Sequence, residues 1–203
     1  MKQTPTVFIV DDDAAVRDAL ALLMRSAHLA CATFTGASDF LAQFNVDAAG
    51  CVLLDVRMPE IDGLELQREL ASRGSRLPVI ILSGHGDIPM AVQALRAGAI
   101  DFLTKPFDSK VLLARVHEAI EIDARARKVH IDRSIIESRL ALLTPRENEV
   151  LKYIAAGMPT KSIAAKIGSS QNTVQNQRSS ILKKMQAESA ADLVRMVMIA
   201  RPE

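Results

Sequence analysis

The first 124 residues alternate short apolar runs with amphipathic stretches of helical period. The short, continuous apolar runs, several rich in β-branched residues, are typical of buried strands. The predicted strands cover residues 7–10, 30–34, 51–55, 78–82 and 100–103. The helical pattern covers residues 14–27, 37–44, 64–72 and 88–97, and returns after Asp108. This alternation predicts a doubly wound α/β domain, with helices on both faces of a five-stranded parallel sheet.

The rest of the chain shows only the helical pattern. From Asp108 to about Ser138 it continues without Pro or Gly, which predicts a long linker helix. Thr144, Pro145 and Glu147 have the spacing of a capping box and begin a second, all-helical domain. Three further helices are expected near 161–168, 171–185 and 189–200. The predicted boundaries are 1–122 for the first domain, 123–139 for the linker and 140–203 for the second domain.

Charge separates the two predicted domains. The net charge is only +1, yet residues 1–124 hold 11 Lys and Arg against 17 Asp and Glu. Residues 125–140 hold 5 against 2, and residues 141–203 hold 9 against 5. An acidic first module and a basic second module indicate that the second one meets a polyanion.

Composition also suggests where the protein works. No apolar run approaches the length of a membrane span, and the N-terminus lacks the pattern of a signal peptide. Cys31 and Cys51 both lie inside predicted strands, which favours buried free thiols in a reducing compartment. We therefore expect a cytoplasmic protein without a membrane partner.

Polar side chains follow the predicted strands at the point where each strand ends. Asp11 and Asp12 follow the first strand, Asp55 ends the third, Ser83 follows the fourth and Lys105 follows the fifth. In doubly wound sheets these ends share one edge, so the carboxylates should converge. Like charges this close need a cation, and Mg²⁺ prefers one or two carboxylates together with a phosphate.

The adjacent Asp13 suits the N-cap of the following helix. A carboxylate beside Mg²⁺ and a lysine can attack phosphorus and form an aspartyl-phosphate. The metal and Lys105 would neutralise the developing charge, and Ser83 would hydrogen-bond a phosphate oxygen. A phosphatase with an aspartyl nucleophile would need a second Asp where Arg57 stands, and a flavin-binding domain would need a Ser/Thr-rich phosphate loop after the first strand.

Four motifs in this region, FIVDDDAAVR, LLDVRMPEIDG, LSGHG and DFLTKPF, resemble the receiver domain of two-component response regulators over about residues 5–122. The stretch HGDIPMAVQALRAGAIDFLTKPF is most similar to the FixJ branch. The resemblance implies a flavodoxin-like strand order of 2-1-3-4-5 and a cis bond between Lys105 and Pro106. It implies Asp55 as phosphoacceptor, Lys105 and Ser83 as catalytic partners, and Ser83 and Phe102 as a switch pair. The implied Mg²⁺ ligands are Asp11, Asp12, Asp55 and the backbone carbonyl of Arg57.

The second domain resembles the LuxR/FixJ-type helix-turn-helix domain over about residues 138–200. Ser170 would cap the recognition helix, whose apolar positions Val174, Ile181, Leu182 and Met185 face the core. Outward amides suit the major groove, where they pair with adenine, and basic side chains suit phosphates. The candidate DNA-binding residues are Lys161, Thr173, Gln175, Asn176, Arg178, Ser179, Lys183 and Lys184. Gln177, where the family usually has His, and Ser169, often apolar, leave the DNA sequence preference open.

Together these features predict a response regulator and transcriptional regulator rather than a turnover enzyme. The expected partners are a sensor histidine kinase, double-stranded DNA, a second copy of the chain after phosphorylation, and RNA polymerase. The alternative is a receiver-headed adaptor whose helical domain binds a protein.

Overall fold

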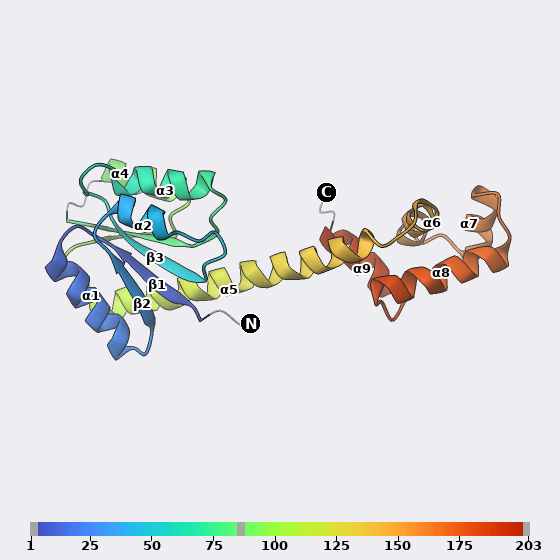
Figure 1. The fold of residues 1–203 in the computed structure, drawn as a ribbon, viewed down its shortest axis with the longest axis horizontal. Coiled ribbons are helices and arrows are strands. Elements are labelled where there is room, and N and C mark those ends of the chain that lie inside the picture. Colours follow the sequence, from blue (N-terminus) through green and yellow to red (C-terminus); the bar gives the residue numbers. More distant parts are fainter. Residues whose placement is uncertain (1–3, 85–87, 201–203) are drawn as a thin grey trace. The chain divides into compact units, whose positions relative to one another are not determined.

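The computed structural model describes residues 4–84 and 88–200, so part of the LSGHG motif lies outside the described residues. The chain divides into two compact units, Met1–Arg127 and Lys128–Glu203. Figure 1 shows the elements of both units, and the helix α5 (Ser109–Leu140) contributes to each.

The first unit contains a sheet of five parallel strands in the order β2-β1-β3-β4-β5. This confirms the expected doubly wound topology and strand order. Each strand lies within one residue of its predicted position. The strands are β1 (Thr6–Val10), β2 (Ala30–Phe34), β3 (Gly50–Asp55), β4 (Val79–Ser83) and β5 (Asp101–Thr104).

Helices cover both faces of this sheet, and every residue of the central strand β3 is buried. One core packs α2, α3 and α4 against one face, and a second core packs α1 and the first part of α5 against the other. Val52 and Leu54 of β3 belong to the first core, whereas Leu53 belongs to the second, as the alternation of a strand requires. The helices are α1 (Ala14–Ser26), α2 (Ala37–Gln43), α3 (Gly63–Ser72) and α4 (Ile88–Arg96).

The last turns of α5 in this unit are anchored at the edge of the sheet where β3 begins, opposite the edge where the strands reach their carboxyl ends. Asp123 is buried and accepts hydrogen bonds from the Gly50 amide, at 2.9 Å, and from Arg127 Nε, at 2.7 Å. Arg127 also donates to the carbonyl oxygens of Asp47 and Ala48. The division of the chain after Arg127 follows from these contacts, since they tie residues of the expected linker to the receiver-like unit.

Both cysteines are free thiols. Cys51 is buried, and its burial together with the charge of Asp123 raises the pKa of the thiol to about 12, so it is unreactive near neutral pH. Cys31 keeps part of its surface exposed.

The second unit packs the C-terminal part of α5 with four shorter helices around one core. The capping box at Thr144 is confirmed, because Thr144 and Glu147 each accept a hydrogen bond from the other's backbone N–H. Val150, Ile163, Val174 and Ile181 lie at the centre of this core. The helices are α6 (Pro145–Ala155), α7 (Thr160–Lys166), α8 (Gln171–Met185) and α9 (Ala190–Ala200). None of the helices in the described part of the chain is long and apolar enough to cross a membrane.

Candidate functional site

The carboxyl ends of β1, β3, β4 and β5 bring the predicted acidic site together. Asp11 directly follows β1 and is 1% exposed, and Asp55 ends the neighbouring strand β3 and is 7% exposed. Ser83 ends β4 and is also buried, while Lys105 directly follows β5. Parallel pairing of adjacent strands therefore places side chains from distant parts of the sequence at one edge.

Lys105 bridges the two carboxylates. Its Nζ donates to Asp11 Oδ2 at 2.7 Å and to Asp55 Oδ1 at 2.6 Å. The other oxygen of each carboxylate accepts from a backbone amide, since Asp13 N–H donates to Asp11 and Arg57 N–H donates to Asp55. Each carboxylate is thus held in orientation by one cationic and one amide donor.

Burial and the neighbouring opposite charges shift the pKa values of Asp55 and Lys105 in opposite directions. Burial, with a smaller contribution from the Asp11 charge, raises the pKa of Asp55 above its usual value despite the Lys105 hydrogen bond. Burial alone lowers the pKa of Lys105, but its hydrogen bonds to the two carboxylates outweigh this and raise the pKa overall. Lys105 therefore remains an ammonium at neutral pH and supplies a fixed positive charge at the site.

The donor set suits a hard divalent cation. Asp11 and Asp55 provide carboxylate oxygens, and Asp12 lies exposed next to Asp11 in the chain. Within residues 4–84 and 88–200, no group of three His, Cys, Asp or Glu side chains is assembled for a metal. Mg²⁺ needs only one or two carboxylates and completes its shell with water and phosphate, so two converging carboxylates fit it.

The third aspartate in the row has a local role. Asp13 is the N-cap of α1, and its Oδ1 accepts from the amides of Ala15, at 2.8 Å, and Val16, at 3.4 Å. This confirms the interpretation of Asp13 as a helix cap.

The close approach of α3 to β3 requires glycine at position 63, which was not predicted from the sequence. A Cβ added at Gly63 would lie 2.2 Å from the backbone oxygen of Asp55, and the Gly63 amide donates to Val56 O at 2.9 Å. Only glycine permits this approach of α3 to the end of β3. The Asp-Gly pair that opens α3 was the available signal.

The remaining features of the expected site lie beside it. The peptide bond between Lys105 and Pro106 is cis. Phe102 is partly buried and packs against the core that includes α3 and α4. The backbone amide of Phe102 donates a hydrogen bond to Asp101 Oδ1 at 2.8 Å, and Asp101 also pairs with Arg115.

An apolar groove adjoins the site on the α1 side. It has a volume of about 420 Å³, and Lys105 forms part of its wall. The other lining residues are mainly apolar and come from α1 and from the chain between β5 and α5; they include Val16, Leu20, Leu23, Pro106 and Phe107. Lys105 therefore belongs both to the acidic site and to the wall of this groove.

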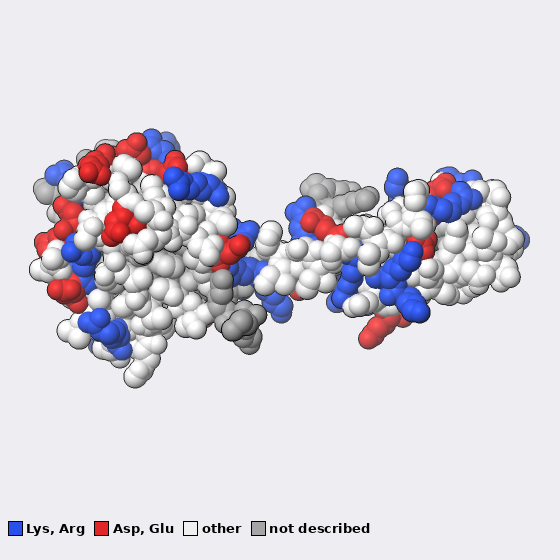
Figure 2. All heavy atoms as spheres, in the orientation of Figure 1, with Lys and Arg blue, Asp and Glu red and all other residues white. Residues whose placement is uncertain are grey.

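In the second unit, α8 presents a polar face and a buried face as predicted. Val174, Ile181 and Met185 are buried, and Leu182 is partly buried. Among the candidate DNA-binding residues, Thr173, Gln175, Asn176 and Ser179 are all exposed, as are Lys183 and Lys161, while Arg178 is half-buried. Figure 2 shows Lys and Arg side chains over the helical unit.

Lys184 has a partner inside the domain that the sequence did not reveal. Its Nζ donates to Glu147 Oε2 at 2.7 Å, and Ser180 donates to Glu147 Oε1 at 2.7 Å. Burial raises the pKa of Glu147, but these bonds and those from Thr144 lower it to about 2. Glu147 thus joins α6 to α8 through its ion pair with Lys184.

Two hydroxyls on the exposed face of α8 form hydrogen bonds with neighbouring residues of the same segment. Thr173 contacts the N-cap Ser170, with 2.8 Å between their Oγ atoms, and Ser179 Oγ donates to the Gln175 carbonyl at 3.1 Å. The amide side chains of Gln175 and Asn176 are therefore the more available groups of this face.

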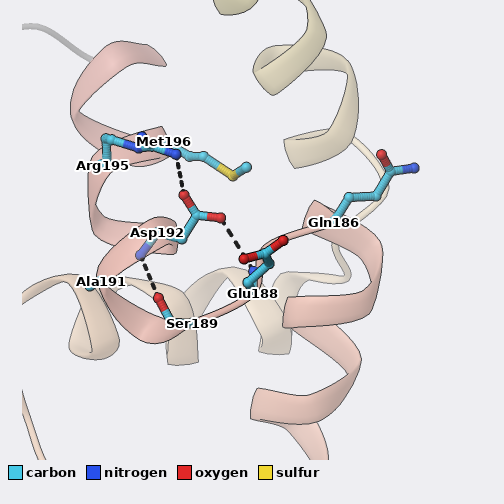
Figure 3. Close-up of a pocket in the computed structure, with 7 residues that line it drawn as sticks. All are labelled: Gln186, Glu188, Ser189, Ala191, Asp192, Arg195 and Met196. Atoms are coloured by element: carbon cyan, nitrogen blue, oxygen red, sulfur yellow. Dashed lines mark hydrogen bonds and ion pairs between the residues drawn. The ribbon is translucent and has the colours of Figure 1, made fainter.

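A second hollow lies at the corner between α8 and α9 (Figure 3). Several of the polar groups that line it bond one another. Ser189 Oγ accepts from the Asp192 amide at 3.1 Å, Asp192 accepts from the Glu188 amide at 3.3 Å, and Arg195 pairs with Asp192. These bonds hold the first turn of α9 in place.

Comparison with known proteins extends over both units. The family described as "Response regulator receiver domain" matches residues 7–117, and the family "Bacterial regulatory proteins, luxR family" matches residues 141–197. The response regulator protein TmoT of Ectopseudomonas mendocina is 43% identical over 194 residues, which cover 96% of this chain and 88% of TmoT. The transcriptional regulatory protein FixJ of Azorhizobium caulinodans is 42% identical over 200 residues, covering 98% of this chain and 95% of FixJ. The solved structure of the response regulator StyR matches with a TM-score of 0.88 and 40% identity, covering 96% of this chain and 98% of StyR.

Proposed function

This chain belongs to the response regulators that join a receiver domain to a LuxR-type DNA-binding domain, and we propose that phosphoryl transfer to Asp55 controls its binding to DNA. The observation that carries the proposal is the bridge from Lys105 to Asp11 and Asp55 at the carboxyl ends of adjacent strands. It joins a buried carboxylate to a fixed cation, which is the pairing that a phosphoryl acceptor needs.

In the proposed reaction, an Asp55 carboxylate oxygen attacks the phosphorus of a phosphohistidine. The new O–P bond forms as the P–N bond breaks, and the histidine ring keeps the electron pair and takes a proton. Lys105 donates to the Asp55 carboxylate before the transfer, and it would donate to a phosphoryl oxygen after the transfer. Mg²⁺, held by Asp11, Asp12, Asp55 and the Arg57 carbonyl, would neutralise charge on the phosphoryl group. The receiver acts on itself and does not turn over a separate substrate.

The phosphoryl donor must approach the same edge of the sheet. The apolar groove between α1 and the chain after β5 lies beside Lys105 and suits the helix of a partner protein. We assign this groove to the sensor histidine kinase that supplies the phosphohistidine.

The response to phosphorylation is assigned to Ser83 and Phe102. Ser83 would donate a hydrogen bond to a phosphoryl oxygen, and its movement would allow Phe102 to turn inward. Because Phe102 packs beside α4, this changes the surface around α4 and β5 and promotes pairing of two copies.

The DNA interface is assigned to the exposed side of α8. Gln175 and Asn176 would read bases, with Thr173 and Ser179 beside them, and Lys161, Arg178 and Lys183 would contact phosphates. Lys184 was expected to contact phosphate as well, but we give it a structural role because it is paired with Glu147.

The test begins with labelling by acetyl phosphate in the presence of Mg²⁺. We expect labelling of the wild-type chain and none of the Asp55→Asn variant. The labelled chain should double in mass by light scattering and shift a DNA duplex selected from a random pool. Undiminished labelling of Asp55→Asn would reject the phosphoacceptor, and a DNA affinity unaffected by labelling would reject the control of binding.

A further inference from the structure

The C-terminal part of α5 has an apolar face that packs into the helical unit. Ile136 is 5% exposed and lies in the core of that unit, and Leu140 packs against the same core. Arg139 donates to the Met185 carbonyl at 3.1 Å and to Gln186 Oε1 at 2.6 Å. This stretch of α5 is therefore a fixed part of the DNA-binding unit.

The same stretch carries a second apolar stripe that faces solvent. Ile131 is 56% exposed and Ile135 is 42% exposed, one turn apart on the helix. Leu142, just after the helix, is 63% exposed and continues their spacing. Ile136 is buried in the core of the helical unit while its neighbour Ile135 stays 42% exposed, so that core covers only part of the apolar surface of this stretch.

The spacing of this stripe is that of a coiled-coil seam. Residues 128, 131, 135, 138 and 142 alternate steps of three and four, as the a and d positions of a heptad do. Ile131, Ile135 and Leu142 fill three of these five positions, and Lys128 and Ser138 fill the others. The opposite side of the helix holds a solvated ion pair, Arg133 to Glu137 at 2.8 Å.

We propose that this seam, defined by residues 128, 131, 135, 138 and 142, pairs with the same seam of a second copy of the chain in a parallel coiled coil. A parallel two-fold arrangement sets each seam residue against its own copy, so Ile131 meets Ile131 and Ile135 meets Ile135. The proposal rests on the proposed dimerisation after phosphorylation and names a surface that the two copies share.

The size of the seam explains why pairing depends on a second event. Its three apolar side chains expose roughly 300 Å² per copy, so a pair buries about 600 Å², against about 1,200–2,000 Å² in stable interfaces. Lys128 and Ser138 weaken it further, because polar residues at seam positions reduce coiled-coil stability. The seam is too small to join two chains alone, and it adds to a contact made elsewhere, such as one between phosphorylated receivers.

Cysteine cross-linking in the full chain tests the register. Ile131→Cys and Ile135→Cys are made in a Cys31→Ala background, with Arg133→Cys, at a similarly exposed position on the opposite side, as the matched control. After labelling with acetyl phosphate and Mg²⁺, mild oxidation should shift the two seam variants to a linked dimer and leave the control monomeric. Equal cross-linking of all three variants, or of none while light scattering shows a dimer, would overturn the seam and leave the proposed dimerisation standing.

A charge-introducing pair of substitutions tests the energetic contribution. Ile131→Glu with Ile135→Glu should weaken the phosphorylated dimer at least about tenfold by sedimentation, since charge replaces apolar seam contacts. Ile131→Leu with Ile135→Leu should keep it within about threefold, since volume and polarity are conserved. An unchanged dimer in the Glu variant would refute the seam. A labelled wild-type chain that stays monomeric would refute both the seam and the proposed dimerisation.

Discussion

Glu147 provides a direct test of how the DNA-binding unit is held together. Its carboxylate is buried between α6 and α8 and accepts from Lys184, Ser180 and the Thr144 amide at 2.7–2.8 Å. The substitution Glu147→Gln keeps the size of the side chain but removes its charge, which leaves the Lys184 ammonium without its carboxylate. We expect a less stable helical unit with an unchanged receiver unit.

The magnitude follows from the pKa of Glu147, which is about 2 in the folded chain against a usual value of 4.5. At about 1.4 kcal/mol for each pKa unit, the ionised carboxylate stabilises the folded unit by about 3 kcal/mol at neutral pH. Because the folded pKa lies below the unfolded one, this stabilisation is complete above pH 4.5. It is lost as the pH falls from about 4.5 to about 2.

Tyrosine fluorescence allows the helical unit to be followed separately. The chain has one Tyr and no Trp, and Tyr153 lies on α6, partly buried against the core of that unit. Urea unfolding followed at Tyr153 should show Glu147→Gln to be less stable by about 3 kcal/mol at pH 7. The difference between variant and wild type should shrink as the pH is lowered through this window.

The matched control is Glu149→Gln, which breaks a pair between Arg146 and Glu149 on the exposed side of the same helix. Exposed pairs contribute about 0.2–1 kcal/mol, so this variant should change stability little at any pH. If wild type and Glu147→Gln lost stability in parallel between pH 4.5 and 2, the ionised Glu147 would not be the source of the stabilisation.

Three further outcomes are expected. Gly63→Ala should lower the stability of the receiver unit by about 2 kcal/mol or more, because its Cβ would collide with the Asp55 carbonyl. Urea unfolding followed by circular dichroism measures this, and an unchanged stability would contradict the close approach. Lys105→Ala should slow labelling by acetyl phosphate at least about 100-fold, because it removes a preorganised positive charge from the site. Labelling at a near-normal rate would show that Lys105 takes no part in the mechanism. Gln175→Ala should reduce affinity for a selected duplex roughly 5- to 150-fold and leave affinity for random DNA unchanged. Lys183→Ala should weaken binding to both duplexes and lower the slope of log affinity against log salt concentration by about one. Equal losses on both duplexes for Gln175→Ala would show that this residue contacts phosphate.

The sequence by itself determined the features that arise from local pattern. Strand and helix positions, the cap at Asp13 and the capping box at Thr144 each depend on residues a few positions apart. The acidic site was also predictable, because parallel strands bring their carboxyl ends to one edge whatever the details of packing. Asp11, Asp55 and Lys105 meet there for that reason.

Contacts between distant segments were decided only by the tertiary structure. The pairing of Glu147 with Lys184 joins residues 37 positions apart, and no periodicity distinguishes this lysine from its exposed neighbour Lys183. Gly63 is needed because α3 approaches the backbone of Asp55, a distance set by the packing of a helix on a sheet. Apolar residues lie on two sides of α5, and only the folded chain shows that Ile136 is covered while Ile131 is exposed. A local pattern identifies which side chains are apolar or charged, but burial depends on which surfaces the whole chain brings against them.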